Sequence, residues 1–334
     1  MKAIIPLAGA GTRLRPHTYT QPKALIPIAG KTILGVIIDQ LLSSGINEFI
    51  FIIGYLGDKI QDYVTSTYPE LKCHFISQND RKGTGHALWL TKDLVAESEI
   101  FIIYGDTICD YDIQKIAESE YSEAGVKRVD YPRNFGIAEV DNQGFIKKIV
   151  EKPLIPKSNM ALVGIFKIKE TKLLFDTLTY MIQNETGSIN GEYYLTEALE
   201  MMISQGMKMK AFKVNNWFDC GKKETLLETN ATLLKSYNAP EDFKTKFPDS
   251  VIIPPVSIAN DCIIEQSIIG PNVTIGDHAK IQSSIISNSI IGAFAVLHEV
   301  VLKSSVIGSD ASITGTSKSL NIGDNADIDF GNKD

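Results

Sequence analysis

Residues 2–13, KAIIPLAGAGTR, decide the fold: a short apolar run leads directly into a glycine-rich turn. An apolar strand followed by such a turn is typical of α/β proteins, in which backbone N–H groups after a parallel strand can cradle an anion. Glycine allows close approach of the backbone, and Arg13 supplies fixed positive charge. The stretch predicts a strand over Lys2–Leu7 with an anion-binding turn after it, although taken alone it also fits a simple tight turn.

Short β-branched runs alternate with helical periodicity over the first 235 residues, which predicts an α/β fold with helices covering a mostly parallel sheet. An apolar stripe at helical spacing begins after Thr32, a candidate N-cap, and ends before Gly45, a candidate C-cap. Later runs alternate more, so part of the sheet is expected to be mixed or antiparallel. The predicted strands are Lys2–Leu7, Glu48–Ile53, Lys72–Ser77, Glu99–Tyr104, Gly136–Val140, Phe145–Val150 and Leu162–Ile168.

A polar stretch over residues 236–250, which carries Pro240 and Pro248, is the predicted linker. A six-residue rhythm follows it, with an Ile-Gly step that recurs at 269–270, 275–276, 291–292, 307–308 and 322–323. This rhythm predicts a short left-handed parallel β-helix whose triangular coils each take about three hexads. The rhythm loosens after Lys280, which predicts insertions that leave the coils as loops.

The composition disfavours several classes of protein, namely nucleic-acid binders, membrane-spanning proteins and disulfide-rich proteins. The 334 residues carry a formal net charge of -7, which disfavours a general nucleic-acid binder. No run approaches the ~20 apolar residues of a membrane span. The four cysteines are Cys73, Cys109, Cys220 and Cys262; they form no close pair, so neither a thiolate metal site nor a disulfide framework is expected. We expect a soluble cytoplasmic protein without nucleic-acid or membrane partners.

Further motifs occur in order after the first turn. They are Thr20-Gln21-Pro22-Lys23, Gln78 with Gly83–Ala87, Tyr104-Gly105-Asp106, Phe135-Gly136, Glu151-Lys152-Pro153, Gly191-Glu192 and Trp217-Phe218-Asp219-Cys220-Gly221. With the Gly-Ala-Gly-Thr-Arg turn, this set resembles the sugar-phosphate nucleotidyltransferases, or nucleotide-sugar pyrophosphorylases, over roughly the first 235 residues. A hexapeptide-repeat helix is a frequent companion of their catalytic domain. The resemblance implies a Rossmann-like nucleotidyltransferase domain over residues 1–235, a linker over 236–250 and a β-helix domain over 251–334.

The resemblance also implies an activity: transfer of a nucleotidyl group from a nucleoside triphosphate to a sugar-1-phosphate, with release of pyrophosphate. By this likeness the catalytic cations are Arg13, Lys23 and Lys152. The nucleotide and its phosphates would contact Leu7, Ala8, Gly9, Gly11, Thr12, Gln78 and Gly83. The sugar phosphate would contact Gly136, Glu151 and Lys152, and Mg²⁺ would be held by Asp106 and Asp219.

The chemistry explains why these residue types are needed. Attack of a sugar-phosphate oxygen on the α-phosphorus brings two anions together, and the nucleophile is already ionised, so the protein must supply cations and positioning rather than a general base. Mg²⁺ prefers carboxylates and phosphate oxygens, which suits paired aspartates. Each residue also has a plainer interpretation: Asp106 as a turn former, Gln78 as an exposed strand-end residue, and Glu151 with Lys152 as a surface charge pair.

Departures from the family pattern leave alternatives open. Many relatives place an arginine where this chain has Asn190, as an extra clamp on the sugar phosphate. The opening over residues 5–9 is similar to uridylyltransferases and residues 151–164 to glucose-1-phosphate thymidylyltransferases, so glucose-1-phosphate with dTTP or UTP is favoured and the base stays open. Guanylyl transfer to mannose-1-phosphate is the alternative within the class.

Two further hypotheses concern other classes of protein. One is a non-catalytic regulatory subunit that binds a nucleotide sugar, and the other is a bifunctional enzyme whose β-helix transfers acyl groups with His278 or His298 as the base. The regulatory hypothesis predicts loss of the charged site residues, which this chain retains. A parallel coil stack exposes flat faces that a second copy can cover, so we expect a homo-oligomer.

Overall fold

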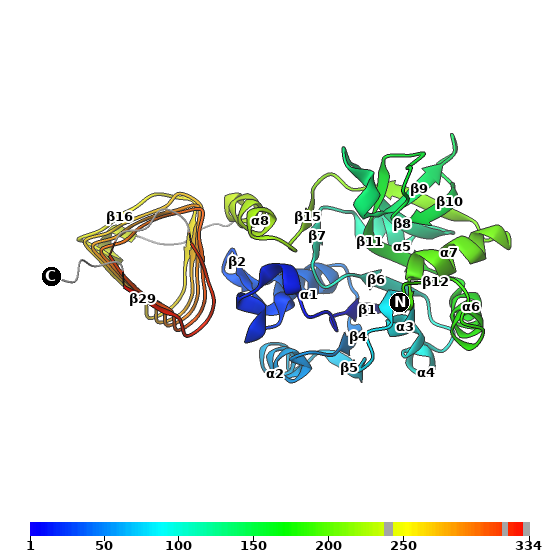
Figure 1. Cartoon of the computed structure of the whole chain (residues 1–334), viewed down its shortest axis with the longest axis horizontal. Helices are drawn as coiled ribbons and strands as arrows, with labels where there is room; N and C mark the ends of the chain where they lie inside the picture. Colours follow the sequence, from blue (N-terminus) through cyan, green and yellow to red (C-terminus); the bar gives the residue numbers. More distant parts are fainter. Residues whose placement is uncertain (237–242, 316–319, 330–334) are drawn as a thin grey trace. The chain divides into compact units, whose positions relative to one another are not determined.

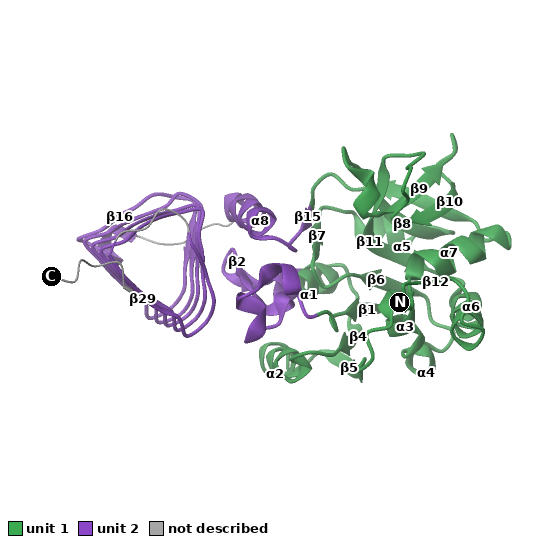
Figure 2. Ribbon diagram, viewed as in Figure 1, with its two compact units in different colours: residues 1–9, 37–217 green, residues 10–36, 218–334 purple. Residues whose placement is uncertain are grey.

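The computed structural model describes residues 1–236, 243–315 and 320–329. The chain divides into two compact units (Figure 2). Unit 1 comprises Met1–Gly9 and Ile37–Trp217, and unit 2 comprises Ala10–Val36 and Phe218–Asp334. Most of the segment that follows the first strand therefore packs with the C-terminal part of the chain, whereas the strand itself belongs to the first unit. None of the helices in the described ranges combines the length and apolar character that crossing a membrane requires.

Unit 1 contains a nine-stranded mixed sheet (Figure 1). Its strands are β1 (Lys2–Pro6), β4 (Glu48–Ile53), β5 (Lys72–Ser77), β6 (Ile100–Ile103), β8 (Ser122–Arg128), β9 (Gly136–Val140), β10 (Ile146–Glu151), β11 (Met160–Ile168) and β14 (Met209–Lys213). The strands β6, β1, β4 and β5 run parallel, and β11 is antiparallel to β6, β8 and β9. All seven predicted strands are present, with their ends shifted by two residues at most. The predicted mixture of parallel and antiparallel pairing is confirmed.

Helix α1 (Ile33–Ser43) begins and ends where its caps predict. The Thr32 hydroxyl accepts a hydrogen bond of 2.9 Å from the Gly35 N–H, which is the N-cap geometry. Gly45 adopts φ 82° and its N–H donates to the Leu42 carbonyl at 3.0 Å, so a left-handed glycine terminates the helix. The other helices of unit 1 are α2 (Gly57–Thr67), α3 (Gly83–Trp89), α4 (Lys92–Val95), α5 (Ile113–Ala117), α6 (Thr171–Gln183) and α7 (Leu195–Ser204).

The apolar core of unit 1 lies between the sheet and helices α3, α6 and α7, which also pack on one another. Its strand residues include Ile4, Ile50 and Ile102, all fully buried. Strands buried in this way read as continuous apolar runs, which is why they are recognisable in the sequence. The carboxyl ends of β1, β4 and β6 emerge together from this core and carry several of the predicted site residues.

Unit 2 joins an early segment of the chain to its C-terminal part. The early segment contains the hairpin β2 (Pro27–Ile28) and β3 (Lys31–Thr32), and the later part begins with helix α8 (Lys223–Lys235). Asn230 of α8 is fully buried, and its side-chain oxygen accepts hydrogen bonds from the Ala29 N–H at 2.9 Å and the Thr274 hydroxyl at 2.7 Å. A single amide side chain thus connects the early segment, α8 and the β-helix.

The C-terminal part forms three parallel sheets that enclose a triangular core, as expected for a left-handed parallel β-helix (Figure 1). One sheet contains β16 (Val251–Ile252), β19 (Ile268–Ile269), β22 (Ile285–Ser287) and β25 (Val301–Lys303). The second contains β17 (Val256–Ile258), β20 (Val273–Ile275), β23 (Ile290–Ile291), β26 (Val306–Ile307) and β28 (Asn321–Ile322). The third contains β18 (Ile263–Glu265), β21 (Lys280–Gln282), β24 (Val296–His298), β27 (Ser312–Thr314) and β29 (Asp327–Asp329).

The coils are shorter than three full hexads. Val251 pairs with Ile268, Ile268 with Ile285 and Ile285 with Val301, so successive coils take 17, 17 and 16 residues. The expectation of bulging loops after Lys280 is wrong through Gly315: the rhythm loosens because the coils shorten. The physical reason lies at the corners, where single residues in the left-handed conformation make each turn and leave some sides five residues long. These corner residues include Gln266, Asn272, His278, Ser283, Asn288 and Phe294.

The predicted linker is only partly described, because residues 237–242 lie outside the described ranges. Helix α9 (Phe243–Lys246) falls within the rest of it. Phe247, which is 3% exposed, and Phe243 pack against the core of the β-helix. The division into residues 1–235, 236–250 and 251–334 therefore stays a prediction.

Candidate active site

The end of β1 is closely packed by glycines from the two neighbouring strands. A Cβ on Gly105 would lie 2.1 Å from Leu7 Cδ2, and one on Gly54 would lie 2.9 Å from the Ala8 Cβ. The Leu7 N–H donates to the Ile52 carbonyl at 2.7 Å, which extends the pairing one residue beyond β1. Gly54 was not among the predicted site residues. It could have been found from its position directly after a predicted strand, which is also the position of Gly105.

Gln78 and Gly83, both predicted to face the nucleobase, lie together in unit 1. Gln78 is 6% exposed, so the interpretation as an exposed strand-end residue is wrong. Its side-chain nitrogen lies 3.1 Å from the Gly83 carbonyl oxygen, to which it donates, and 3.1 Å from His86 Nδ1. Gly83 adopts φ 88°, and a Cβ there would lie 2.5 Å from the Tyr193 carbonyl, so only glycine fits.

His86 is a polar neighbour that the sequence did not single out. Burial lowers the pKa of its imidazole, and the nearby Lys82 ammonium lowers it further. Its ring stacks at 6.0 Å on that of Trp89, one helical turn later. The signal that could have identified it is its place inside the Gly83–Ala87 motif.

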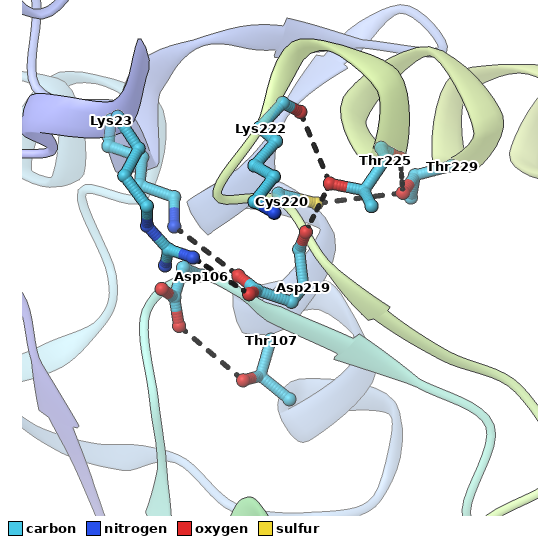
Figure 3. A network of polar contacts seen from close by, with 9 residues as sticks. Lys23, Asp106, Thr107, Asp219, Cys220, Lys222, Thr225 and Thr229 are labelled. Atoms are coloured by element: carbon cyan, nitrogen blue, oxygen red, sulfur yellow. Dashed lines mark hydrogen bonds and ion pairs between the residues drawn. The ribbon is translucent and has the colours of Figure 1, made fainter. Parts of the chain in front are cut away.

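Asp106 follows β6 closely and accepts a hydrogen bond of 3.5 Å from the Thr107 hydroxyl (Figure 3). Tyr104 lies two residues earlier, and the pKa of its phenol responds to the charges around it. Its burial raises the pKa of its phenol well above the ordinary value, and the negative charges of Glu151 and Asp106 raise it further. Tyr104 is therefore a neutral hydrogen-bonding group at neutral pH, with two carboxylates in its surroundings.

Glu151 and Lys152 form the second polar cluster of unit 1. The Glu151 carboxylate accepts a hydrogen bond of 2.8 Å from the Thr196 hydroxyl and lies 3.4 Å from Lys152 Nζ. The Glu151 side chain is 9% exposed and the Lys152 side chain 52% exposed, so a nearly buried carboxylate is paired with a half-exposed ammonium. A Cβ on Gly136 would lie 3.0 Å from a Glu151 carboxylate oxygen, which explains the glycine. Lys152 adopts φ 44°, a strained conformation of the kind found at functional sites.

The start of helix α7 completes this cluster with residues that the sequence analysis did not assign. Lys152 Nζ lies 4.8 Å from the centre of the Tyr194 ring, and the Tyr194 hydroxyl donates to Glu192 at 2.6 Å. Burial and the charges of Glu151 and Glu200 raise the pKa of Glu197. The local signal was the position of Tyr194, Thr196 and Glu197 shortly after the Gly191-Glu192 motif.

Unit 2 brings Arg13, Lys23 and Asp219 together (Figure 3 shows Lys23 and Asp219). One Asp219 carboxylate oxygen lies 3.4 Å from Arg13 Nη1, and the other lies 3.7 Å from Lys23 Nζ. Lys23 is 12% exposed, whereas the Arg13 side chain is 55% exposed and open to a ligand. A Cβ on Gly221 would lie 2.5 Å from Arg13 Nη2, so this glycine leaves the space that the guanidinium occupies.

The rest of the glycine-rich turn is held by local contacts. Gly11 adopts φ 61°, and a Cβ there would lie 2.9 Å from Thr18 Cγ2. The Thr18 hydroxyl donates to the Gly11 carbonyl at 2.9 Å. Thr12 begins a 3₁₀ turn over Thr12–Leu14, and Gly9 has no atom near the position of a Cβ. Contacts with Thr18 therefore fix the conformation of the turn at Gly11, whereas the space beside the Cα of Gly9 is empty of protein atoms.

Asn190 makes a turn in this structure. It adopts φ 55° and Gly191 adopts φ 80°, and they connect β12 (Ser188–Ile189) to β13 (Glu192–Tyr193). Asn-Gly is the preferred sequence for a two-residue hairpin, because both positions need positive φ. Asn190, which stands where many relatives have an arginine, therefore forms part of the hairpin turn that leads into Glu192.

The donor chemistry of Asp219 fits a cation. Its two carboxylate oxygens already face two cationic side chains, and a pair of carboxylates is the donor set that Mg²⁺ prefers. No cluster of three or more His, Cys, Asp or Glu side chains suited to a metal occurs in residues 1–236, 243–315 and 320–329. Any metal would therefore depend on a few aspartates plus ligand oxygens.

Comparison with known proteins places these motifs in context. The nucleotidyl transferase family model matches residues 2–236. The bifunctional protein GlmU of Methanocaldococcus jannaschii is 37% identical over 270 residues, which cover 80% of this chain and 61% of that protein. The low-salt glycan biosynthesis nucleotidyltransferase Agl11 of Haloferax volcanii is 30% identical and covers 94% of both chains. A glucose-1-phosphate thymidylyltransferase of Streptomyces griseus is 26% identical, also with 94% of both chains covered.

A solved structure shares the fold. The crystal structure of a UDP-glucose pyrophosphorylase complexed with UDP-glucose superposes with a TM-score of 0.62 at 22% identity, covering 71% of this chain and 99% of that one. This chain spans about three fifths of the length of the GlmU relative and nearly all of Agl11. With its ordered motifs, its mixed sheet and the family model that matches residues 2–236, the chain belongs to the nucleotidyl transferase family.

Proposed function

We propose that this protein transfers a nucleotidyl group from a nucleoside triphosphate to a sugar-1-phosphate and releases pyrophosphate. The observation that carries the proposal is the convergence of Arg13 and Lys23 on Asp219. Asp219 follows them about 200 residues later in the sequence, and the fold of unit 2 brings it within 4 Å of both cations. The Arg13 side chain is 55% exposed, so its guanidinium can turn from Asp219 to an anionic ligand. Membership of the nucleotidyl transferase family supports the same reaction class.

The triphosphate would be bound by the turn that carries Gly9, Gly11 and Thr12. Backbone N–H groups there can donate to phosphate oxygens, and Arg13 and Lys23 would neutralise the charge that grows as pyrophosphate leaves. In this proposal the contacts of both cations with Asp219 weaken as they turn to the phosphates. Leu7 and Ala8 would contact the nucleoside, with Gln78 and Gly83 at the base.

Lys152 would bind the phosphate of the incoming sugar phosphate. Its ammonium is half exposed and positioned by the Tyr194 ring and the Glu151 carboxylate. Glu151, fixed by the Thr196 hydroxyl, and Gly136 would contact sugar hydroxyls. The attacking phosphate oxygen is already ionised at neutral pH, so its orientation matters more than proton removal.

Asp106 and Asp219 are the proposed ligands of Mg²⁺, an assignment that rests on the resemblance to the family. The ion would neutralise phosphate charge and orient the triphosphate for in-line attack. A divalent requirement is tested by titrating EDTA and then Mg²⁺ against pyrophosphate release. Activity that persists without any divalent ion would exclude this role.

Glucose-1-phosphate with dTTP or UTP is the favoured substrate pair. The Streptomyces griseus relative supports thymidylyl transfer, and guanylyl transfer to mannose-1-phosphate is the alternative. The deciding experiment incubates the protein with Mg²⁺, each triphosphate and a panel of sugar-1-phosphates and follows pyrophosphate release. Release with no pair would favour the regulatory hypothesis. Acetyl transfer from acetyl-CoA would favour the bifunctional one, for which His278 is a weak candidate because its ring stacks on Phe294 at 4.9 Å.

We also propose that one face of the β-helix binds a second copy of the chain. The outward side chains of four consecutive rungs are apolar, and they are 56%, 38%, 46% and 46% exposed: Val251, Ile268, Ile285 and Val301. Rungs in such a sheet repeat every ~4.8 Å, and another β-helix is the surface that matches this spacing over the whole ladder. Isologous pairing of two identical ladders would cover both.

The association is tested by light scattering. The double variant Ile268→Lys with Ile285→Lys is expected to be a monomer under conditions in which the parent protein is a dimer or larger. Gln282→Lys, an exposed position on another sheet, is the matched control. A parent protein that stays monomeric at high concentration would exclude the interface. For location we propose the cytoplasm, because the four cysteines lie far apart in the sequence and form no close pair that would suggest a disulfide framework, as is usual in a reducing compartment.

A further inference from the structure

The segment that carries Arg13 and Lys23 is docked on the last described coil of the β-helix, within unit 2. His17 is 5% exposed, and its Nε2 forms a short hydrogen bond with the Asn321 side-chain oxygen. Three residues later, the Thr20 hydroxyl donates a short hydrogen bond to an Asp324 carboxylate oxygen. Between them a Cβ on Gly323 would lie 2.9 Å from Pro16 Cβ, so the coil and the segment are in close contact there as well.

This segment has little regular structure of its own. Its elements are three short 3₁₀ turns over Thr12–Leu14, His17–Tyr19 and Lys23–Leu25. Isolated turns of this length are not stable in water, because few hydrogen bonds form for the residues that are fixed. The position of Arg13 and Lys23 must therefore come from what the segment packs against.

Asp324 is oriented for this contact by the coil itself. One carboxylate oxygen accepts a hydrogen bond of 2.8 Å from the Ser309 N–H of the preceding coil, and the other faces Thr20. Asp277 makes the equivalent bond to the Asn260 N–H at 3.1 Å, also after an Ile-Gly step. Asp277 thus provides an internal comparison, because it has the same role within the β-helix but belongs to a coil remote from Thr20.

The same coil also reaches the cavity beside Arg13. Asn321 lines a cavity of about 460 Å³ together with Arg13, Lys222, Lys223 and Glu224. Three of these five side chains are cationic. The coil therefore borders the space that opens next to the proposed phosphate-binding arginine.

We propose that Asn321 and Asp324 of the β-helix are positioning residues for the triphosphate-binding segment. They act through His17 and Thr20 to hold Arg13 and Lys23 in place, and this gives the β-helix a role in the reaction beside self-association. The inference rests on the proposed function, because the triphosphate is the ligand that the segment is held for. Neither residue is proposed to touch the reacting atoms.

Kinetics of Asp324→Ala and Asp277→Ala give the first test. Asp324→Ala is expected to lower kcat/KM for the triphosphate roughly 10- to 100-fold, the scale of a misplacement of about 1 Å, with little change in KM for the sugar-1-phosphate, whose proposed ligands lie in unit 1. Asp324→Asn, which keeps an acceptor for the Ser309 N–H and a hydrogen-bonding group for Thr20, is expected to restore most of the loss. Asp277→Ala is expected to stay near the parent values.

Hydrogen–deuterium exchange gives a second test that needs no activity. Amides in residues 12–25 are expected to exchange at least about tenfold faster in Asp324→Ala and in Asn321→Ala than in Asp277→Ala, because local opening no longer costs the docking contacts. Equal exchange and equal kinetics in Asp324→Ala and Asp277→Ala would overturn the inference. A parent protein that releases no pyrophosphate would refute the proposed function, and the exchange comparison would still decide whether the coil positions the segment.

Discussion

The substitution Gly221→Ala tests the charged cluster of unit 2 with a single methyl group. The new Cβ would lie 2.5 Å from Arg13 Nη2 and 2.7 Å from an Asp219 carboxylate oxygen. Ordinary contact requires about 3.5 Å, so the guanidinium must move by about 1 Å and the Asp219 carboxylate by slightly less. Arg13 is the half-exposed end of a flexible side chain, and it can move without disturbing the core.

The expected magnitudes separate activity from stability. Losing an exposed ion pair costs about 0–1 kcal/mol, so the free energy of unfolding should hardly change. A 1 Å misplacement of a charge-stabilising group costs roughly 100-fold in kcat/KM, or about 2.7 kcal/mol. Steady-state pyrophosphate release with the triphosphate varied, together with urea denaturation, measures both quantities for Gly221→Ala and the parent protein.

A double-mutant cycle with Arg13→Ala identifies the cause. If the methyl group acts by displacing the guanidinium, Gly221→Ala should cost almost nothing in the Arg13→Ala background. A full additional loss in that background would show that the methyl group acts through another contact, such as the one with the Asp219 carboxylate. Unchanged kcat/KM for Gly221→Ala alone would refute the idea that the position of Arg13 beside Asp219 is the active one.

Other described contacts lead to three more expected outcomes. Lys152→Met should raise KM for the sugar-1-phosphate about 10-fold or more while leaving KM for the triphosphate nearly unchanged, since its ammonium is proposed to bind only the former; equal effects on both would contradict this. Asn230→Ala should lower the free energy of unfolding by about 2–4 kcal/mol in urea, because two buried donors lose their acceptor, whereas the exposed Glu228→Ala on the same helix should not. Burial and neighbouring carboxylates raise the pKa of Glu197, so its ionisation costs stability as pH rises through that raised pKa; Glu197→Gln should melt higher than the parent at pH 7, with the gap closing below about pH 4, and a gap independent of pH would disprove the cause.

The strands of the sheet are predictable because they are short runs rich in apolar and β-branched residues, which are buried in β4 and β6 and half-buried in β5. Glu48–Ile53 and Lys72–Ser77 match β4 and β5 residue for residue, and the caps of α1 are recognisable as Thr32 and Gly45. The β-helix is recognisable from its Ile-Gly rhythm, but its coil length is not. A hexad pattern predicts that corners exist, but whether five or six residues separate successive left-handed corner residues is seen only in the structure.

The same distinction applies to the candidate site: the types of residue could be predicted from the sequence, and their contacts could not. The sequence by itself determined which charged and glycine residues to examine, because local chemistry requires a turn with exposed N–H groups, cations and carboxylates. Tertiary structure decided that Asp219 faces both Arg13 and Lys23, and that Tyr194 and Thr196 support Lys152 and Glu151. It also decided that the last described coil of the β-helix contacts the segment carrying Arg13. Contacts between residues about 200 or 300 positions apart depend on how whole elements pack, and no local pattern encodes that packing.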